Sequence, residues 1–234
     1  MTGTLYVVAT PIGNLKDVTL RALETLKSVD FIACEDTRRA ATLLRTHEIR
    51  TPTVSYHSYS GARRARQVLE RLQAGERAAL ISDAGTPGVS DPGAGLIHDA
   101  IGAGISVTVI PGASASLAAL VVSGFPTDRF VFEGFLPVKP GPRRKRLEAL
   151  QDETRTVILY EAPHRMLKML QEIETVFGDP VLSVSRELTK LFEETRRGRA
   201  SELREHFAQQ APRGEFVVVL PPQRLRAHGE SDPS

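Results

Sequence analysis

Groups able to transfer a proton stand together in the segment LYEAPHR, which carries Glu161, His164 and Arg165. A carboxylate and an imidazole can act as general base and general acid, and an adjacent guanidinium can hold an anionic substrate group. The hydrophobic pattern predicts a strand before Glu161 and a helix after it. A carboxylate in that place is also stabilised by the helix dipole without any catalytic role, so both interpretations stay open.

Two further segments carry charged pairs after predicted strands. SRELTKLFEE contains Glu187 and Lys190, three residues apart, which are either catalytic groups or a surface ion pair. ACEDTRR contains Asp36 and Arg38, and Asp36 is also well suited to cap the helix that follows.

Three turns rich in glycine and proline follow predicted strands: TPIGN after the first, ALISDAGTPGVSDPG at the fourth and PGASA after the fifth. Ligands bind open parallel sheets at the carboxyl ends of the strands, so the turns predict one ligand-binding rim. None of them has a P-loop or a Gly-x-Gly-x-x-Gly pattern, which argues against a nucleotide triphosphatase and a Rossmann nicotinamide site. Within the long turn, Asp83 is a candidate to face the substrate, whereas Asp91 is expected to cap the next helix.

Strands and helices are expected to alternate along the chain, which predicts an α/β fold with a parallel sheet in its first half. Expected strands cover residues 5–9, 31–34, 54–56, 78–81, 106–110, 130–133, 156–160, 181–184 and 216–220. Expected helices cover residues 18–29, capped by Asp17, and residues 37–46, 63–73, 96–103, 111–122, 163–177 and 201–208, with one more ending near residue 151. We expect an N-terminal α/β domain over residues 1–113, a C-terminal α/β domain over 114–222 and a loose polar tail over 223–234.

The composition limits the classes of protein and of partner. The 234 residues carry a net charge of only +2, yet 24 of the 30 basic residues are arginine, which suits bidentate phosphate contacts. The single cysteine, Cys34, excludes an internal disulfide and a cysteine-based zinc cluster. The sequence shows no apolar stretch of membrane-spanning length and no signal peptide, so a cytoplasmic protein without membrane contact is expected.

Basic residues gather in three clusters, and local positive patches of this kind are what contact with an RNA backbone requires. The clusters are Arg63, Arg64 and Arg66; Arg143, Arg144, Lys145 and Arg146; and Arg196, Arg197 and Arg199.

The turns, in this order, resemble the tetrapyrrole methylase superfamily of S-adenosylmethionine enzymes, and within it the ribosomal RNA small subunit methyltransferase I family. The matching segments are LYVVATPIGNLKDVTLRAL, CEDTR, ALISDAGTPGVSDPG, VIPGASA, FEGFLP, LYEAPHR, SRELTKLFEE and GEFVVVL. The resemblance implies two α/β domains with the active site in the cleft between them, and a homodimer. It also implies S-adenosyl-L-methionine as cofactor, no metal ion, and 2′-O-methylation of a cytidine ribose in 16S rRNA, either free or within the 30S subunit.

Carried over by position, the resemblance implies cofactor contacts from Pro11, Ala84, Gly85, Thr86, Val89, Ser114, Ala115 and Tyr160. The chain departs from most of the superfamily after its first strand, where Ala-Thr-Pro-Ile-Gly-Asn replaces Gly-x-Gly-Pro-Gly-Asp, and at Thr86, which replaces an aspartate. Both departures fit the RNA-directed branch. Family members often carry a C-terminal extension, which we do not expect in this sequence, so the arginine clusters are expected to supply more of the RNA contact.

Placement after the strands then suggests a role for each charged candidate. The expected catalytic residues are Glu161, Glu187 and Lys190; the expected substrate-side residues are Asp36, Arg38 and Asp83; and the expected phosphate contacts are Arg143, Arg144, Lys145 and Arg146.

Two other functions remain open. A C-methyltransferase acting on a tetrapyrrole such as a corrin precursor would also use arginine clusters, against the substrate's carboxylates; CEDTR and YEAPHR argue against it. A non-catalytic ribosome assembly factor would hold RNA and bind no cofactor.

Overall fold

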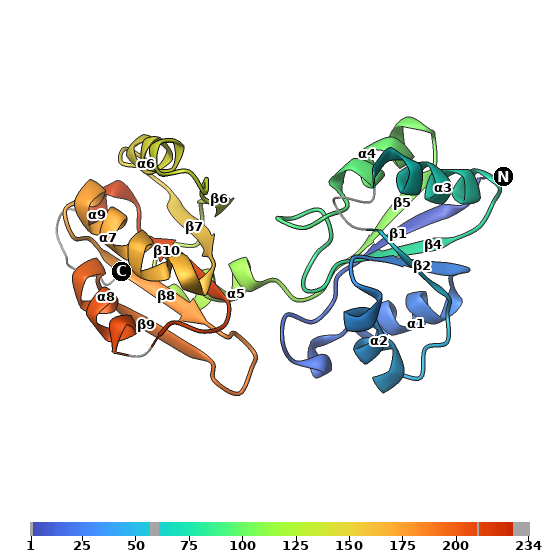
Figure 1. Cartoon of the computed structure of the whole chain (residues 1–234), viewed down its shortest axis with the longest axis horizontal. Coiled ribbons are helices and arrows are strands. Elements are labelled where there is room, and N and C mark those ends of the chain that lie inside the picture. The colour runs from blue at the N-terminus through green and yellow to red at the C-terminus, as the bar shows by residue number, and fades with distance from the viewer. Residues whose placement is uncertain (1, 57–60, 210, 227–234) are drawn as a thin grey trace. The chain divides into compact units, whose positions relative to one another are not determined.

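The chain consists of two compact units, Met1–Ser114 and Ala115–Ser234, each with its own five-stranded sheet (Figure 1). The computed structural model describes residues 2–56, 61–209 and 211–226. None of the helices within those ranges is long and apolar enough to cross a membrane.

The sheet of the first unit is entirely parallel, as predicted, with the strand order β3-β2-β4-β1-β5. Its strands are β1 (Thr4–Val8), β2 (Phe31–Cys34), β3 (Thr53–Ser55), β4 (Ala78–Ile81) and β5 (Ser106–Ile110). Alternate residues of β2 and β4 enter two separate hydrophobic clusters, one on each face of the sheet. A strand buried on both faces reads as an unbroken apolar run, which is why these strands were visible in the sequence.

Two pairs of helices cover this sheet, one pair on each face (Figure 1). One face carries α1 (Leu20–Ser28) and α2 (Thr37–Thr46), and the other carries α3 (Gly61–Gln73) and α4 (Ala94–Gly102).

The helix caps agree with prediction in one case and differ in two. Asp36 caps α2, because its carboxylate accepts a hydrogen bond from the backbone N–H of Arg38 at 2.8 Å. The expected cap of α1 by Asp17 is wrong: Asp17 ends a short 3₁₀ turn, and the Thr19 hydroxyl accepts the capping hydrogen bond instead. The expected cap of α4 by Asp91 is also wrong, because the N-cap is Gly93 at φ 131°.

The sheet of the second unit is mixed, with the strand order β6-β7-β10-β8-β9. Its strands are β6 (Phe130–Phe135), β7 (Thr156–Glu161), β8 (Val181–Arg186), β9 (Glu194–Arg199) and β10 (Phe216–Leu220). Only β6 and β7 pair in parallel; the other neighbours are antiparallel. The sequence did not predict β9, because its residues, ETRRGR, lack the apolar alternation of a half-buried strand and only its pairing with β8 defines it.

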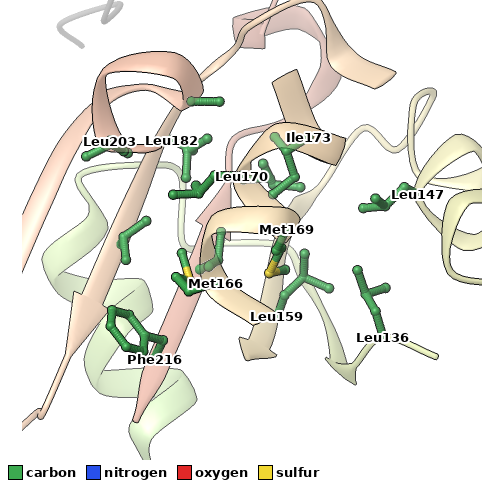
Figure 2. Close-up of a cluster of buried hydrophobic side chains, with 14 of the residues drawn as sticks. Leu136, Leu147, Leu159, Met166, Met169, Leu170, Ile173, Leu182, Leu203 and Phe216 are labelled. Carbon is green, nitrogen blue, oxygen red and sulfur yellow. The ribbon is translucent and has the colours of Figure 1, made fainter. Parts of the chain in front are cut away.

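The second core lies between this sheet and several helices, among them α7 (Met166–Phe177) (Figure 2). Four buried side chains of α7 recur at spacings of three and four, which places them on one face of the helix: Met166, Met169, Leu170 and Ile173. The other helices of this unit are α5 (Ala115–Ser123), α6 (Pro140–Ala149), α8 (Ala200–Ala208) and α9 (Gln223–Arg226).

The first four residues of the expected loose tail, 223–226, are packed, and residues 227–234 lie outside the described part of the chain. The Arg226 guanidinium is buried and donates hydrogen bonds to the backbone oxygens of Leu150 and Pro221, both at 2.7 Å. It also lies 4.8 Å from the ring centre of Phe177. These contacts hold α9 against the rest of the second unit.

The close approach of Gly3 to the turn before β4 gives a test of the fold. A Cβ atom on Gly3 would lie 1.7 Å from the backbone oxygen of Glu76, so Gly3→Ala should lower the free energy of unfolding by about 1–3 kcal/mol or more. Gly95, inside α4, is the matched control, since a Cβ there meets nothing within 4 Å. Gly95→Ala should raise the free energy of unfolding by about 0.5–1 kcal/mol. Urea denaturation measures both, and equal effects would contradict the packing.

Candidate functional site

The turns after β1 and β4 are joined directly by their backbones. Thr10 and Gly85 exchange two backbone hydrogen bonds, of 2.9 and 3.1 Å, and the Thr10 hydroxyl donates to the backbone oxygen of Ser82. This exchange is possible because β1 and β4 are neighbours in a parallel sheet, so that their carboxyl ends meet.

The turn after β5 packs against the turn after β1 on the side opposite to β4. A Cβ on Gly112 would lie 3.0 Å from the Cβ of Ala9. A Cβ on Gly85 would lie 3.6 Å from Ile12 and 3.9 Å from the backbone oxygen of Ala113, between the first and third turns. The three turns therefore form one continuous rim, called the glycine rim below.

The predicted cofactor residues of the first unit gather on the glycine rim. Pro11 and Gly85 are buried, Ala84 and Thr86 are half-buried, and Val89 is 46% exposed. Gly85 has φ +71°, a left-handed conformation that side-chain-bearing residues rarely adopt. The rim is thus backbone and small side chains.

The remaining predicted cofactor residues lie further along the chain. Ser114 ends the first unit and Ala115 begins α5, and both are half-buried. Tyr160 is also half-buried and belongs to β7 of the second unit.

The predicted substrate-side residues also come together, at the ends of β2 and β4. The backbone N–H of Asp36 donates to the carboxylate of Asp83 at 3.3 Å, and Arg38 donates to the Asp36 carboxylate at 2.9 and 3.2 Å. Hydrogen bonds from Arg38 lower the pKa of Asp36 to about 2, so the carboxylate stays charged at neutral pH. Arg39, which we did not predict, pairs with Asp83 at 3.0 Å. These residues line an open depression of about 540 Å³.

The buried Cys34 thiol, at the carboxyl end of β2, is unreactive at neutral pH. Burial, followed by the nearby charges of Asp83 and Asp36, raises its pKa to about 11. It is therefore neither a nucleophile nor a thiolate ligand at neutral pH. Across the described parts of the chain, no group of three or more histidine, cysteine, aspartate or glutamate side chains is placed to hold a metal ion.

Glu161, a predicted catalytic base, is held inside the second unit by an ionic cluster. Its side chain is 0% exposed and pairs with Arg143 and Arg165, each at 2.7 Å, while the backbone N–H of Ala162 donates to it at 2.8 Å. Arg143 also pairs with Glu172 of α7. A carboxylate enclosed in this way cannot reach a substrate hydroxyl.

This cluster corrects two predicted roles. Glu161 is a structural residue, and the strand alternation also turns it to the face of the sheet opposite to that of Tyr160. Arg143, predicted to contact phosphate, is only 2% exposed and lies between two carboxylates, so it is not available to RNA. The sequence could not show this burial, because it depends on ion pairs between residues that are distant in the chain.

Glu187 and Lys190 form a second, more accessible group at the same edge of this sheet. Lys190 pairs with Glu187 at 2.9 Å and with Glu215 at 3.0 Å. Gly214 leaves room for the Glu187 carboxylate, because a Cβ at position 214 would lie 2.3 Å from one of its oxygens. Both side chains of the first pair keep 21–28% of their surface exposed.

The charges of this pair are fixed across a wide pH range. Burial raises the pKa of Glu187, but hydrogen bonds from Lys190 and from the Glu215 backbone outweigh it, so the pKa lies below its ordinary value. Burial lowers the pKa of Lys190, but the two carboxylates outweigh it, so that pKa lies above its ordinary value. The stability contributed by the pair is lost only when the pH falls through the lowered pKa of Glu187 or rises through the raised pKa of Lys190.

The other predicted phosphate contacts lie on α6. Arg144, Lys145 and Arg146 are exposed; Arg144 pairs with Glu148 at 2.8 Å, and Arg146 pairs with Glu133 of β6.

Two arginines of the third basic cluster bind other parts of the second unit. Arg197 donates to the backbone oxygen of Ser123 at 2.8 Å, and Arg199 is the N-cap of α8.

Comparison with known sequences assigns the chain to a family. Residues 4–204 match the family of tetrapyrrole (corrin/porphyrin) methylases. The chain is 52% identical to the ribosomal RNA small subunit methyltransferase I of Synechocystis sp., over 93% of this chain and 78% of that protein. It is 44% identical to the protein of the same name from Thermotoga maritima, over 93% of this chain and 98% of that protein.

Solved structures agree on the fold. The chain is similar to a cobalt precorrin-4 methyltransferase, with a TM-score of 0.70 at 15% identity over 92% of this chain and 94% of that one. It is also similar to a uroporphyrin-III C-methyltransferase from Thermus thermophilus, complexed with S-adenosylhomocysteine, with a TM-score of 0.66 at 17% identity over 93% of this chain and 97% of that one. At this identity the likeness concerns the fold alone, and it is the sequence relatives that decide the branch: the chain belongs to the ribosomal RNA small subunit methyltransferase I family of the tetrapyrrole methylases.

Proposed function

We propose that this protein is a methyltransferase that transfers a methyl group from S-adenosylmethionine to the ribose 2′-oxygen of a cytidine in 16S rRNA. The observation that carries the proposal is the 44% identity to a small subunit rRNA methyltransferase over nearly the whole of both chains. The glycine rim supports it, because the rim stands at the sheet edge where α/β folds bind ligands.

The residues of the glycine rim fit the cofactor. Gly85 leaves open the space that a side chain would take between the first and third turns. We propose cofactor contacts from Pro11, Ala84, Gly85, Thr86, Val89, Ser114, Ala115 and Tyr160. When bound, S-adenosylmethionine supplies a methyl group already activated by its sulfonium, so the protein has mainly to position the attacking oxygen.

Glu187 and Lys190 are the catalytic residues of this proposal. The Glu187 carboxylate is ionised at neutral pH and can accept a hydrogen bond from the ribose hydroxyl while the oxygen attacks. Lys190 stays protonated, so it cannot act as a base. Its role is to hold Glu187 in place and to stabilise negative charge that develops on the oxygen.

Substrate contacts are assigned to two surfaces. Asp36, Arg38 and Asp83 line the open depression of the first unit and would contact the nucleotide. The cations of α6, Arg144, Lys145 and Arg146, would contact RNA phosphates. We also propose a homodimer that acts in the cytoplasm, where ribosomal subunits are its substrate.

The test of the function uses labelled S-adenosylmethionine and 30S subunits from a strain that lacks the enzyme. Label should enter one cytidine ribose of 16S rRNA. Transfer of label to a tetrapyrrole precursor but not to RNA would establish the C-methyltransferase alternative. Absence of cofactor binding, measured by calorimetry with S-adenosylhomocysteine, would instead establish the assembly-factor alternative.

The cofactor role of the glycine rim is tested by a matched pair of glycines. Gly85 and Gly104 both have φ +71°, so alanine at either position carries a similar backbone cost of about 1–2 kcal/mol. Only Gly85 lies on the rim, whereas a Cβ on Gly104 meets nothing within 4 Å. Gly85→Ala should weaken S-adenosylhomocysteine binding at least about tenfold, and Gly104→Ala should leave it unchanged. Equal affinities of the two variants would refute the role of the rim.

The different roles of the two glutamates predict opposite phenotypes. Glu161→Gln removes the negative charge that pairs with the buried Arg143 and the half-buried Arg165, so it should lower the free energy of unfolding by about 3–5 kcal/mol. Glu187→Gln should fold normally and bind the cofactor normally, yet lower kcat by about 100-fold. Glu205→Gln, at an exposed position of α8, is the control. A Glu187→Gln enzyme with the wild-type kcat would rule out the catalytic assignment.

The phosphate contacts of α6 should show in the salt dependence of RNA binding. If Arg144 and Lys145 each neutralise one phosphate, replacing both by glutamine should reduce the slope of log K against log salt by about 1.4. Arg155 and Lys168, two partly or fully exposed cations elsewhere in the unit, give the control double variant. An unchanged slope in the first variant would remove α6 from the RNA interface.

A further inference from the structure

An aromatic side chain stands exposed at the carboxyl end of β6. Phe135 is 51% exposed, whereas the next residue, Leu136, is 2% exposed and belongs to the core of the second unit (Figure 2). Since successive side chains of a strand point to opposite faces, Phe135 is turned away from that core. A β-bulge between Phe132 and Gly134, where Gly134 has φ +68°, sets this orientation.

The ring of Phe135 is held in place by a second aromatic residue. Phe135 is the register partner of Tyr160 on β7, and the two rings meet edge to face with centroids 5.6 Å apart. Tyr160 in turn meets Phe132 edge to face at 5.0 Å. These contacts fix the plane of the Phe135 ring while half of its surface stays open.

The helix that follows Phe135 in the chain carries exposed cations. Four residues, 136–139, link β6 to α6, and α6 presents the exposed cations Arg144 and Lys145. A bidentate pair between Arg146 and Glu133 ties the helix to β6, two residues before Phe135. A fixed aromatic face beside cations is the combination that binds single-stranded nucleic acid, with the ring against a base and the cations against the backbone.

Phe192 is a more exposed aromatic residue of this unit, but its setting differs. Phe192, 71% exposed between β8 and β9, is followed by the acidic residues Glu193 and Glu194. Among the described residues no aromatic ring contacts Phe192, so its plane is not fixed in the way that Tyr160 fixes the ring of Phe135, and this difference favours Phe135 as the RNA contact.

We propose that Phe135 stacks on a nucleobase of the RNA substrate and thereby determines which nucleotide is presented for methylation. The proposal rests on the proposed function and adds to it the residue that recognises the base. Tyr160 positions the ring of Phe135 from the neighbouring strand.

The experiment measures methylation kinetics of Phe135→Ala and Phe135→Trp on 30S subunits. Loss of stacking on one base should raise KM for the subunit about 5–150-fold in the alanine variant, while the tryptophan variant stays near wild type. Phe130→Ala is the control, since Phe130 is 39% exposed at the opposite end of the same strand. Affinity for S-adenosylhomocysteine and the sedimentation mass should not change in any of the variants.

Three results would overturn the inference. A wild-type KM in Phe135→Ala would exclude stacking, a loss of S-adenosylhomocysteine affinity would make Phe135 a cofactor contact, and a change of sedimentation mass would make it an interface between copies of this chain. Failure of the proposed function is distinct, because the wild-type protein itself would then leave the 30S subunit unmethylated.

Discussion

The site depends on the order of three parallel strands. Because β1 lies between β4 and β5, the turns that leave all three strands arrive at one edge of the sheet. The exchange of backbone hydrogen bonds between Thr10 and Gly85 then joins two of these turns into one surface. Peptide groups and small side chains form this surface, so a ligand can approach the backbone closely.

Burial distinguishes two groups of charged residues in the second unit. Glu161 and Arg143 look reactive in the sequence, but the fold encloses them in an ionic cluster that connects β7, α6 and α7. Glu187 and Lys190 stand at the same sheet edge and keep part of their surface open. Because side chains alternate along β7, Tyr160 and Glu161 lie on opposite faces of the sheet.

The sequence predicts those parts of the structure that have a recognisable local residue pattern. Buried parallel strands such as Ala78–Ile81 leave continuous apolar runs, and their end turns leave glycine and proline, so the first sheet and its rim were predictable. The edge strand β9 leaves no such signal. The burial of Arg143 and the packing of Arg226 depend on residues distant in the chain, Glu161 and Leu150, and no local pattern reveals such partners. Caps are predictable only in part, because several residues near a helix start can accept the same hydrogen bond: Thr19 does so where Asp17 was expected.

The proposed function requires that the glycine rim binds the cofactor. The most direct measurement is a crystal structure of the protein with S-adenosylhomocysteine. We expect the bound molecule to lie against the backbone of Ala84, Gly85 and Thr86 and the turn that begins α5. A molecule bound in the open depression beside Asp36, or anywhere away from the rim, would contradict it.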